Sequence, residues 1–587
     1  MEKHTWTVND VLNGEDKQTV YQRIEDLTDT LTGYEDRLDS VTASDLKRFL
    51  RTYENLLEEL SSISAYYSLT FAEDTSNTDV LAKQKQVSQR RADISNDLLF
   101  FFDWFKHLDD ERARAYIESP ELETYAYYLE TLRDKAQYTR SKDVEEALTI
   151  KDITVGNLSD LYQTITNDFT YEFNGETITE SELKTYMVST DPAERRASYD
   201  VLFEEYQENA TALSEVYTMI ANDWRNEATK IRGYEESIAV RSTGQDIDAD
   251  AIHALMDVVR ENRTVFQDYF DVKHDILTSL GQDISKDRVH VYAPLTTDKK
   301  EYSFDEAKEL ILQTFKSFDE RFHDAAQKIF EADHIDSHPR QNKRSGAFCH
   351  DAPRDIPPYI LTNFDGTQND VLTLAHELGH GIHDVLIQDK SKLNRHPVMP
   401  MAETASVFAE TLVLDELQSR VEKPEQRTAL LGQFLDDQFA TILRQVYITE
   451  FERQAHEALE EGASQDDLNE IYMDLLEEQF GDLNIPEMFK EEWHRIPHIH
   501  RSPFYCYAYA WGNLLVLSLY DIYQDQGDDF IDDYVAMLTA GRSESPSALL
   551  QRFGFDPADP TFWERGIHVI ERRLNTLKQT QNTSNGR

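Results

Sequence analysis

Two histidines and a glutamate in His376-Glu377-Leu378-Gly379-His380 have the types and spacing of a hydrolytic metal site. On a helix, residues four apart share one face and lie about 6 Å apart along the axis, so both imidazoles can bind one ion. Zn²⁺ accepts imidazole ligands, and Glu377 beside it can take a proton from an activated water and pass it to a departing amine. The motif therefore predicts metal-assisted hydrolysis of an amide bond.

The residues around this motif predict the helix that it needs. An apolar stripe at spacings of four, four and three is typical of an amphipathic helix with one buried face, and it consists of Leu374, Leu378, Ile382 and Val385. Asn369 or Asp370 is expected to cap the start of the helix. Matches to the motif on exposed helices without a metal also occur, so a third ligand is needed to support the site.

His383 is a poor third ligand. It lies two helical turns after His376, about 10.5 Å along a straight helix, too far for both to bind one ion. The metzincin pattern is also absent, because His383 takes the place of its glycine and Leu386 the place of its third histidine. We expect His383 to pack or to support a ligand.

Glu403 is the stronger candidate. A polar, proline-containing loop at residues 389–400 permits an antiparallel return of the chain, which can place the Glu403 carboxylate opposite the two histidines. Two histidines and one glutamate form a known catalytic zinc set. Glu410, two turns later on the same face, is expected to hydrogen-bond a ligand. The alternative for Glu403 is a solvated helix residue.

Several separated segments together carry a family resemblance. The chain resembles oligoendopeptidase F, within the thimet oligopeptidase family of zinc metallopeptidases. The matching segments are residues 346–349, 358–364 and 373–383 around the motif, residues 403–406, residues 496–498 and 503–510 near the C-terminus, and residues 65–68 and 74–77. They span most of the chain.

The resemblance implies a zinc endopeptidase that hydrolyses internal bonds of short oligopeptides, with one Zn²⁺ held by His376, His380 and Glu403. It also implies a mainly α, zincin-like fold. Two helical lobes would surround a deep substrate channel, with a few short antiparallel strands near the metal site. Short peptides are the expected partners, whereas the oligomeric state is not predicted.

The segment near the C-terminus supplies candidate donors for the oxyanion that develops during peptide hydrolysis. By resemblance, His498 and Tyr505, Tyr509 or both bind the scissile carbonyl oxygen or the substrate backbone. Helical spacing puts these two tyrosines on one face and Tyr507 roughly opposite. The alternative is an aromatic run that packs in the core. The choice among the tyrosines stays open.

Length and composition agree with a large helical protein. The 587 residues exceed the usual size of a single core, and only 20 Gly and 16 Pro interrupt them. Amphipathic helices are predicted at residues 45–64, 80–105, 193–227, 250–280 and 426–461. The predicted organisation is an N-terminal helical lobe with a hairpin-bearing insertion at 1–190, a catalytic domain at 191–580 and a polar tail at 581–587.

Three short segments are predicted to be extended. Residues 171–178 contain Asn174-Gly175 between apolar residues, which indicates a tight hairpin. Residues 288–292 and 358–364 are short β-like runs. The second leads to the metal helix, and we expect its backbone to pair with substrate as a strand added at a sheet edge.

The remaining features concern location. The first residues lack a basic segment followed by an apolar run, and no apolar stretch reaches the roughly 20 residues of a membrane span. A cytoplasmic location is therefore expected. The two cysteines, Cys349 and Cys506, provide no disulfide framework. Both flank the predicted site, where they are either a reactive pair or, as we favour, buried thiols.

The charge is strongly acidic, with 111 Asp and Glu against 59 Lys and Arg and a formal net charge of −52. Nucleic acids and anionic membranes need basic patches, so neither is an expected partner. The acids are spread along the whole chain. This favours a solvated surface, suited to a salty cytoplasm, over a cleft selective for cationic peptides.

Two other functions stay open. One is a metal-dependent carboxypeptidase on the same fold, although the sequence reveals no site for a terminal carboxylate. The other is a non-catalytic peptide-binding protein, against which the intact base and ligand set argues. Ligand types alone also leave cobalt and manganese open as alternatives to zinc.

Overall fold

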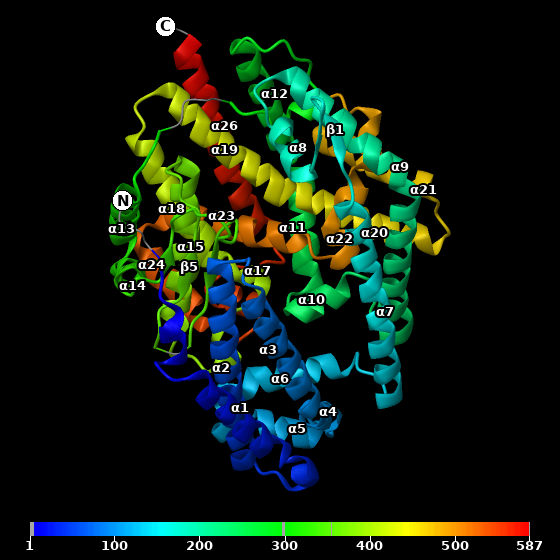
Figure 1. Ribbon diagram of the computed structural model, residues 1–587, viewed down its shortest axis with the longest axis vertical. Coiled ribbons are helices and arrows are strands. Elements are labelled where there is room, and N and C mark those ends of the chain that lie inside the picture. Colours follow the sequence, from blue (N-terminus) through cyan, green and yellow to red (C-terminus); the bar gives the residue numbers. More distant parts are fainter. Residues whose placement is uncertain (1–4, 296–299, 354, 586–587) are drawn as a thin grey trace. The chain divides into compact units, whose positions relative to one another are not determined.

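The computed structural model describes residues 5–295, 300–353 and 355–585. Helices form most of it, which confirms the predicted mainly α class (Figure 1). Contacts divide the chain into two compact units. Unit 1 comprises Met1–Gln137, Lys300–Ser419 and Gln526–Gly554, and unit 2 comprises Tyr138–Lys299, Arg420–Asp525 and Phe555–Arg587.

Unit 1 begins with a group of helices at the N-terminus and adds a small sheet and the motif helix. Its elements are η1 (Val8–Leu12), α1 (Lys17–Thr32), η2 (Glu35–Ser40), α2 (Ala43–Glu73), α3 (Thr78–Asp97), α4 (Leu99–His107), α5 (Asp110–Ile117), η3 (Pro120–Tyr125), α6 (Ala126–Ala136), α13 (Phe304–Phe318), α14 (Glu320–Glu331), β3 (Ile335–Asp336), β4 (Phe348–His350), β5 (Tyr359–Leu361), α15 (Gln368–Ile387), α16 (Lys392–Arg395), α17 (Met399–Ala402), α18 (Thr404–Arg420), α24 (Asp528–Ala540) and α25 (Pro546–Arg552).

Unit 2 contains most of the longest helices. Its elements are α7 (Lys142–Asn167), β1 (Tyr171–Phe173), β2 (Glu176–Ile178), α8 (Glu180–Met187), α9 (Pro192–Arg225), η4 (Asn226–Arg232), α10 (Ala239–Gln245), α11 (Ala249–Glu261), α12 (Thr264–Ser279), η5 (Arg288–His290), α19 (Pro424–Gln438), η6 (Phe439–Leu443), α20 (Arg444–Glu460), α21 (Gln465–Phe480), η7 (Glu487–Arg495), α22 (Pro497–Arg501), α23 (Tyr507–Gln526) and α26 (Pro560–Asn585).

The N-terminal helices of unit 1 form around a continuous apolar core. Figure 1 shows α1, α2 and α3 as neighbouring blue helices, and α2 packs against both others. A capping box between Thr42 and Asp45 starts α2 and satisfies backbone N–H groups at its first turn. Within the core, Phe49 of α2 stacks on Phe101 of α4 with ring centroids 4.1 Å apart.

A three-stranded sheet in the order β3-β5-β4 lies between α14 and α15 in the chain. β5 pairs in parallel with β3 and antiparallel with β4, so the sheet is mixed and not wholly antiparallel as predicted. The predicted strand at 358–364 is present as β5. Its expected pairing with substrate is wrong, because neighbours on both sides already use its backbone groups. β4 is an edge strand.

The long predicted helices are present with interruptions. A π-helical segment, η4, follows α9, and another, η6, joins α19 to α20. The segments predicted at 80–105 and 250–280 are each two helices, with breaks at Leu98 and at Asn262–Arg263. The apolar periodicity therefore predicted the helical regions correctly. The breaks within them could not be predicted, because no Gly or Pro marks these positions in the sequence.

The predicted hairpin is confirmed. β1 and β2 pair antiparallel with Phe173 opposite Glu176, and Asn174 and Gly175 both adopt positive φ values, 53° and 83°. These angles match the mirror-image turn that Asn-Gly favours. The strand predicted at 288–292 is wrong. Asp287 accepts a hydrogen bond from the Val289 N–H and starts the short 3₁₀-helix η5 instead.

The predicted boundary near residue 190 lies inside unit 2, just before α9, and each unit gathers segments from distant parts of the sequence. The predicted catalytic domain, 191–580, contributes residues to both units and stays a prediction. The predicted polar tail is helical through Asn585, where α26 ends, and residues 586–587 lie outside the described part of the chain.

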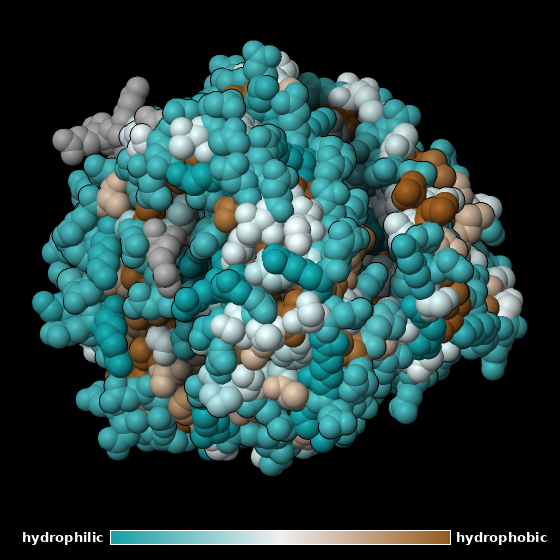
Figure 2. Space-filling model, turned by 90° about the horizontal axis from the view of Figure 1, so that it is seen from below, coloured by the Kyte–Doolittle hydropathy of each residue, from teal (hydrophilic) through white to brown (hydrophobic). Residues whose placement is uncertain are grey.

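The surface agrees with the acidic, polar composition. On the face shown in Figure 2, hydrophilic residues dominate, and apolar residues occur in small separate groups. Among the residues that the structure describes, no helix combines the length and apolar character that crossing a membrane requires.

Candidate metal centre

Helix α15 carries the motif, and its N-cap lies two to three residues before the residues predicted to cap it. Thr367 is the N-cap, and it forms a capping box with Asp370. The predicted caps, Asn369 and Asp370, are therefore corrected, because Asp370 completes the cap from the third helical position. Leu374, Leu378 and Ile382 are fully buried, as the stripe predicted.

Two glycines allow other elements to approach this helix closely. A Cβ atom on Gly379 would lie 2.5 Å from Ser406 Cα and 2.7 Å from the Ala405 carbonyl oxygen, so only glycine fits against α18 here. On Gly381, a Cβ atom would meet Ile329 of α14 at 2.6 Å. The backbone of α18 thus reaches the motif because the side chain at position 379 is missing.

This approach brings the three predicted ligands together. Nε2 of His376 lies 3.4 Å from Oε2 of Glu403, and Nε2 of His380 lies 3.5 Å from the same oxygen. One ligand atom from each residue lies within 4.8 Å of the others. Glu403 occupies the junction between α17 and α18. Two imidazole nitrogens and one carboxylate oxygen therefore converge on one point.

Each of the three side chains is held by a further contact. Nδ1 of His376 lies 3.1 Å from Oε2 of Glu410, the contact expected for that glutamate. A ring N–H of His380 donates to the Ala402 carbonyl, and the Ser406 hydroxyl donates to Oε2 of Glu403 at 2.8 Å. Hydrogen bonds of this kind fix ring orientation in metal sites. The donor set and its supports fit a divalent cation.

The electrostatics of the site favour a positive charge at this point. Burial opposes protonation of His376, but the carboxylates of Glu403 and Glu410 outweigh it and raise its pKa to about 10. Burial lowers the pKa of His380 to about 4. Burial would raise the pKa of Glu403, yet His376 and His380 hold it at about 2. The carboxylates thus require a cationic partner.

Glu377 lies beside these ligands and is only 7% exposed. The backbone N–H of Cys349, on the edge strand β4, donates to its carboxylate. Burial raises the pKa of Glu377 to about 7, although His376 and this N–H act in the opposite direction. The base candidate is therefore oriented by the sheet and partly shielded from water.

His383 takes the packing role expected for it. It is buried, and its Nε2 lies 3.1 Å from the Leu538 carbonyl oxygen of α24. Burial lowers its pKa to about 4. The histidine therefore joins α15 to α24, two elements of unit 1, and does not belong to the ligand set.

The candidate substrate-binding residues lie in unit 2. Nε2 of His498 lies 3.2 Å from the Tyr509 hydroxyl, and the rings of Tyr505 and Tyr509 meet edge to face with centroids 5.3 Å apart. Tyr505 precedes α23 and is not on it as predicted, yet the two rings still meet. Tyr507 is fully buried and donates to Gln245, so it points elsewhere.

Sequence reasoning missed the groups that hold this segment. Phe504 adopts a positive φ of 57°, a conformation that is uncommon for a large side chain. Its N–H donates to Glu452 at 2.8 Å, and Arg241 donates to the Pro503 carbonyl oxygen at 2.7 Å. Burial raises the pKa of Glu452 to about 8. Residues far away in sequence thus fix the turn that leads to Tyr505.

Both cysteines are free thiols. Burial raises the pKa of Cys349 and of Cys506 well above that of an exposed thiol. A raised pKa suppresses the reactive thiolate of both residues. Cys506 is buried as predicted, whereas Cys349 on β4 is only partly buried, so the burial predicted for it is wrong.

A second group of carboxylates in unit 2, Asp152, Asp223 and Glu227, also places oxygen atoms close together. Lys151 already neutralises this group. Its Nζ lies 2.8 Å from Asp223 and hydrogen-bonds Glu227. This arrangement is an ion-pair network and not a competing metal site.

Comparison with known protein families shows to which family the chain belongs. The model of peptidase family M3 matches residues 185–569, well over half of the sequence. The chain belongs to peptidase family M3. This is a family of metallopeptidases, so the chain is a peptidase of a metal-dependent class. The separate Oligopeptidase F model matches residues 104–171.

Relatives of this M3 peptidase cover nearly its full length. An oligoendopeptidase F homologue of Borreliella burgdorferi is 26% identical over 91% of both chains. Oligopeptidase PepF of Bacillus subtilis is 23% identical over 98% of this chain and 87% of its own. The resemblance to oligoendopeptidase F seen in the sequence is thereby confirmed.

Solved structures share the fold of the M3 peptidase. A structure from Chlamydophila abortus aligns with a TM-score of 0.88 at 23% identity and covers 98% of both chains. Oligoendopeptidase F of Enterococcus faecium aligns with a TM-score of 0.71 at 21% identity, covering 96% of this chain and 98% of its own. At these identities the alignments establish the fold.

Proposed function

We propose that this M3 peptidase is a zinc-dependent endopeptidase that hydrolyses internal bonds of short peptides. The observation that carries the proposal is the convergence of His376, His380 and Glu403, whose ligand atoms lie within 4.8 Å of one another. Two imidazoles and one carboxylate are a catalytic zinc set that leaves a coordination position for water. We propose a single ion.

The supports of the ligands are consistent with this assignment. Glu410 and the Ala402 carbonyl engage one ring nitrogen of each histidine, which leaves Nε2 of both rings directed at Glu403. Zinc, when bound there, supplies a Lewis acid that polarises a carbonyl group and makes water more acidic. Cobalt and manganese accept similar ligands and stay alternatives.

Glu377 is the proposed general base. Its carboxylate accepts the proton of the attacking water and then donates it to the nitrogen of the departing amine. The N–H of Cys349 holds this carboxylate in one orientation. Because the side chain is nearly buried, few bulk water molecules compete for its oxygen atoms.

We also propose, from the resemblance, that His498 with Tyr505, Tyr509 or both binds the carbonyl oxygen or backbone of the peptide. The imidazole and the Tyr509 phenol already form one hydrogen-bonded group. Both side chains offer N–H or O–H donors, as an oxyanion requires. Tyr507 is excluded from this proposal because Gln245 engages its hydroxyl.

The proposed substrates are short oligopeptides, since the relatives are named oligoendopeptidases and oligopeptidases. A cytoplasmic location, expected from the sequence, stays a proposal. The competing enzymatic function is a metal-dependent carboxypeptidase on the same fold, which removes single C-terminal residues.

One experiment distinguishes these functions. A mixture of unmodified short peptides is incubated with the purified protein, with and without a chelator, and the products are identified by mass spectrometry. Internal cuts that disappear with chelator and return with added Zn²⁺ are expected. Removal of single C-terminal residues would establish a carboxypeptidase. Cleavage that persists after the metal is removed, verified by elemental analysis, would overturn the proposed centre.

A further inference from the structure

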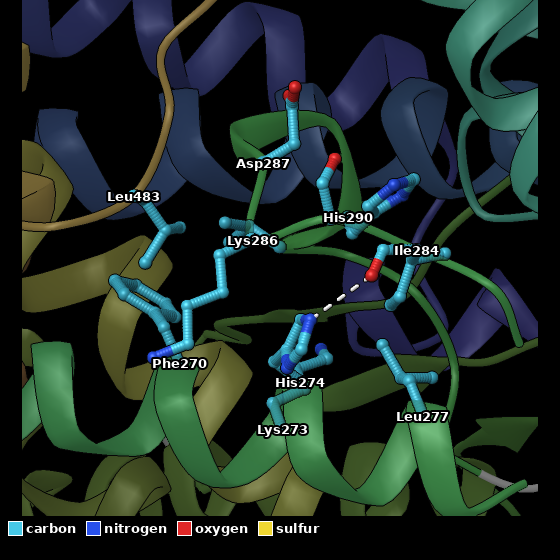
Figure 3. A pocket seen from close by; sticks show the side chains of 11 residues that line it. Phe270, Lys273, His274, Leu277, Ile284, Lys286, Asp287, His290 and Leu483 are labelled. Atoms are coloured by element: carbon cyan, nitrogen blue, oxygen red, sulfur yellow. Dashed lines mark hydrogen bonds between the residues drawn. The ribbon is translucent and has the colours of Figure 1, made fainter.

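Unit 2 contains a cavity that the proposed chemistry does not use. Its volume is about 470 Å³, within the usual range for ligand pockets. By comparison, the cavity beside α12 in Figure 3, where His274 hydrogen-bonds the Ile284 carbonyl oxygen, has a volume of about 20 Å³, roughly that of one water. Of these two cavities, the larger one has room for part of a peptide and the smaller one does not. Its polar lining includes Tyr162, Glu180, Lys184, Tyr206, Arg444 and Arg495.

The charge of this cavity is opposite to that of the protein. Three cationic side chains, Lys184, Arg444 and Arg495, face one carboxylate, Glu180, in the lining. The whole chain carries almost twice as many acidic as basic residues, 111 against 59. A cationic pocket in such a chain attracts anions that the rest of the surface repels.

The guanidinium groups keep donors available. Nε of Arg495 donates to Oε1 of Glu180 at 2.9 Å, and the part of the chain that the structure describes offers no hydrogen-bond acceptor to either Nη. Arg444 donates from Nη2 to Glu492 in a long contact of 3.4 Å. The side chain of Arg495 is 19% exposed and that of Arg444 is 24% exposed. Two largely buried arginines with open donors, facing a cavity that solutes can enter, are suited to bidentate binding of a carboxylate.

The aromatic walls add contact area for the rest of such a ligand. Tyr162 donates to the His494 carbonyl oxygen, and Tyr206 donates to Oε2 of Glu180. Their rings are therefore fixed before a ligand arrives. A preorganised pocket loses little entropy on binding.

Residues that line the cavity directly precede the proposed substrate-binding histidine in the sequence. Arg495, Ile496 and Pro497 line it, and His498 follows directly. Three residues of extended chain span at most about 11 Å, so Arg495 and His498 lie within the reach of a few peptide residues. Arg444 also acts on His498, since its charge helps to lower the pKa of that histidine after the larger effect of burial.

We propose that this cavity binds the C-terminal α-carboxylate of the substrate peptide through Arg495 and Arg444. The proposal rests on the proposed function, in which His498 binds the same peptide. Anchoring the carboxylate near His498 fixes how many residues follow the cleaved bond. The enzyme would then measure its cut from the C-terminus, and a chain without a free end near the site would be a poor substrate.

The first test compares peptides of one sequence that end in a free acid or an amide. Binding to the Glu377→Gln protein is measured by calorimetry at constant ionic strength, which gives an affinity without turnover. Loss of a charge-assisted contact predicts about 10- to 100-fold weaker binding of the amide. Equal affinities would overturn the proposal while leaving the metal mechanism intact.

Two arginine variants show whether the cavity is responsible. Arg495→Met keeps the apolar length of the side chain and should make acid and amide bind equally. The control, Arg196→Met, changes an exposed arginine on α9 and should keep the full difference. If Arg495→Met fails to fold because Glu180 loses its partner, the double variant Glu180→Gln/Arg495→Met removes both charges and tests the same loss. Discrimination that survives in a folded variant would refute the assignment.

A third peptide separates the two sources of a carboxylate. An amidated peptide that carries a glutamate near its end should bind as weakly as the plain amide. Tight binding of this peptide through Arg495 would show that the cavity reads an acidic side chain, which would contradict the proposed recognition of the terminus.

The position of the cut gives an independent readout with the wild-type enzyme. Nested free-acid peptides extended at the N-terminus should be cut at the same distance from the C-terminus, whereas extension at the C-terminus should move the cut. If the enzyme cuts the same peptide bond whichever end of the peptide is extended, the proposal is rejected. Absence of chelator-sensitive cleavage in every peptide would instead reject the proposed function, so the two failures are distinguishable.

Discussion

Nδ1 of His376 lies 3.1 Å from Oε2 of Glu410, and this contact joins the motif helix to the helix that follows the third ligand. The same histidine directs Nε2 at Glu403. One ring therefore lies between two carboxylates from one stretch of chain. Glu410 fixes the orientation of the ring, and it adds negative charge that strengthens the pull on a cation.

Glu410→Ala should weaken metal binding by about 10- to 100-fold, because the ring of His376 loses its orienting partner. Glu410→Gln keeps an acceptor oxygen without the charge and should have a smaller effect. Affinity is measured by competition with a metal-binding dye. Glu320→Gln, at an exposed position on α14, is the control. Unchanged affinity in both Glu410 variants would show that the contact is dispensable.

Glu377→Gln should retain metal and fold but reduce kcat by about 10²- to 10⁴-fold, because glutamine cannot accept the proton of water. The measurement is turnover of an internally quenched peptide, together with metal content by elemental analysis. Near-normal turnover in protein that is fully loaded with metal would refute the role of Glu377 as the base.

Gly379→Ala should destabilise unit 1 by about 1–3 kcal/mol, because the new Cβ would meet backbone atoms of Ser406 and Ala405. The shift of α18 should also weaken metal binding through Glu403. Thermal unfolding and dye competition report the two effects. Gly156→Ala on α7 is a matched control, since its Cβ would meet nothing within 4 Å and should stabilise the helix by up to about 1 kcal/mol.

Acid should destabilise unit 2 through its buried histidines. Burial lowers the pKa values of His456 and His500 to about 3, whereas an unfolded histidine titrates near 6.5. The unfolded chain therefore binds more protons below pH 6.5. Each histidine should lower the free energy of unfolding by about 1.4 kcal/mol for every pH unit between about 6.5 and 3.

His456 offers a direct check of this pH dependence, because neither of its ring nitrogens has a hydrogen-bond partner among the described residues. His456→Leu should leave stability at pH 7 similar and make its loss between pH 6 and 4 shallower. Urea unfolding across this pH range gives the slope. His568→Leu, at an exposed position on α26, should keep the original slope. An unchanged slope in His456→Leu would contradict the assignment.

Salt should raise the stability of the protein or leave it unchanged. The net charge of −52 is spread over the chain, and at about 1 M salt the screening length falls to about 3 Å, which relieves repulsion between surface carboxylates. Melting temperature is recorded in 0.1 M and 1 M sodium chloride. A sharp fall at high salt would mean that surface ion pairs outweigh the repulsion.

The sequence allowed the convergence of His376, His380 and Glu403 to be predicted, because two of these side chains lie at helical spacing. His376 and His380 share one face because they are four residues apart on a helix. Glu403 follows a loop that lets the chain run back antiparallel, so its carboxylate could be expected opposite the two histidines. The supports of these ligands were harder to find. The Ala402 carbonyl and the Cys349 N–H are backbone groups, and no residue type identifies them in a sequence.

Local errors also have physical causes. Thr367 and Asp370 form a capping-box pattern that is visible in the sequence, whereas the prediction of Asn369 or Asp370 as the cap follows the start of the apolar stripe. Residues 288–292 alternate like a strand, yet the Asp287 side chain turns the chain into η5. The cationic cavity was not predictable, because Arg444 and Arg495 meet only after α20 and η7 fold together with α7 and α8.

Each unit is built from three separate segments of the chain, so parts of one unit are synthesised at different times. The Leu538 carbonyl accepts from His383, and Tyr534 donates to the Thr404 carbonyl oxygen beside Glu403. Both supports belong to the last segment of unit 1, Gln526–Gly554, which is synthesised after the ligands and after most of unit 2. A nascent chain that already contains every ligand still lacks these anchors. The proposed metal centre therefore gains these two contacts only late in synthesis, after the candidate ligands and most of unit 2 have been made.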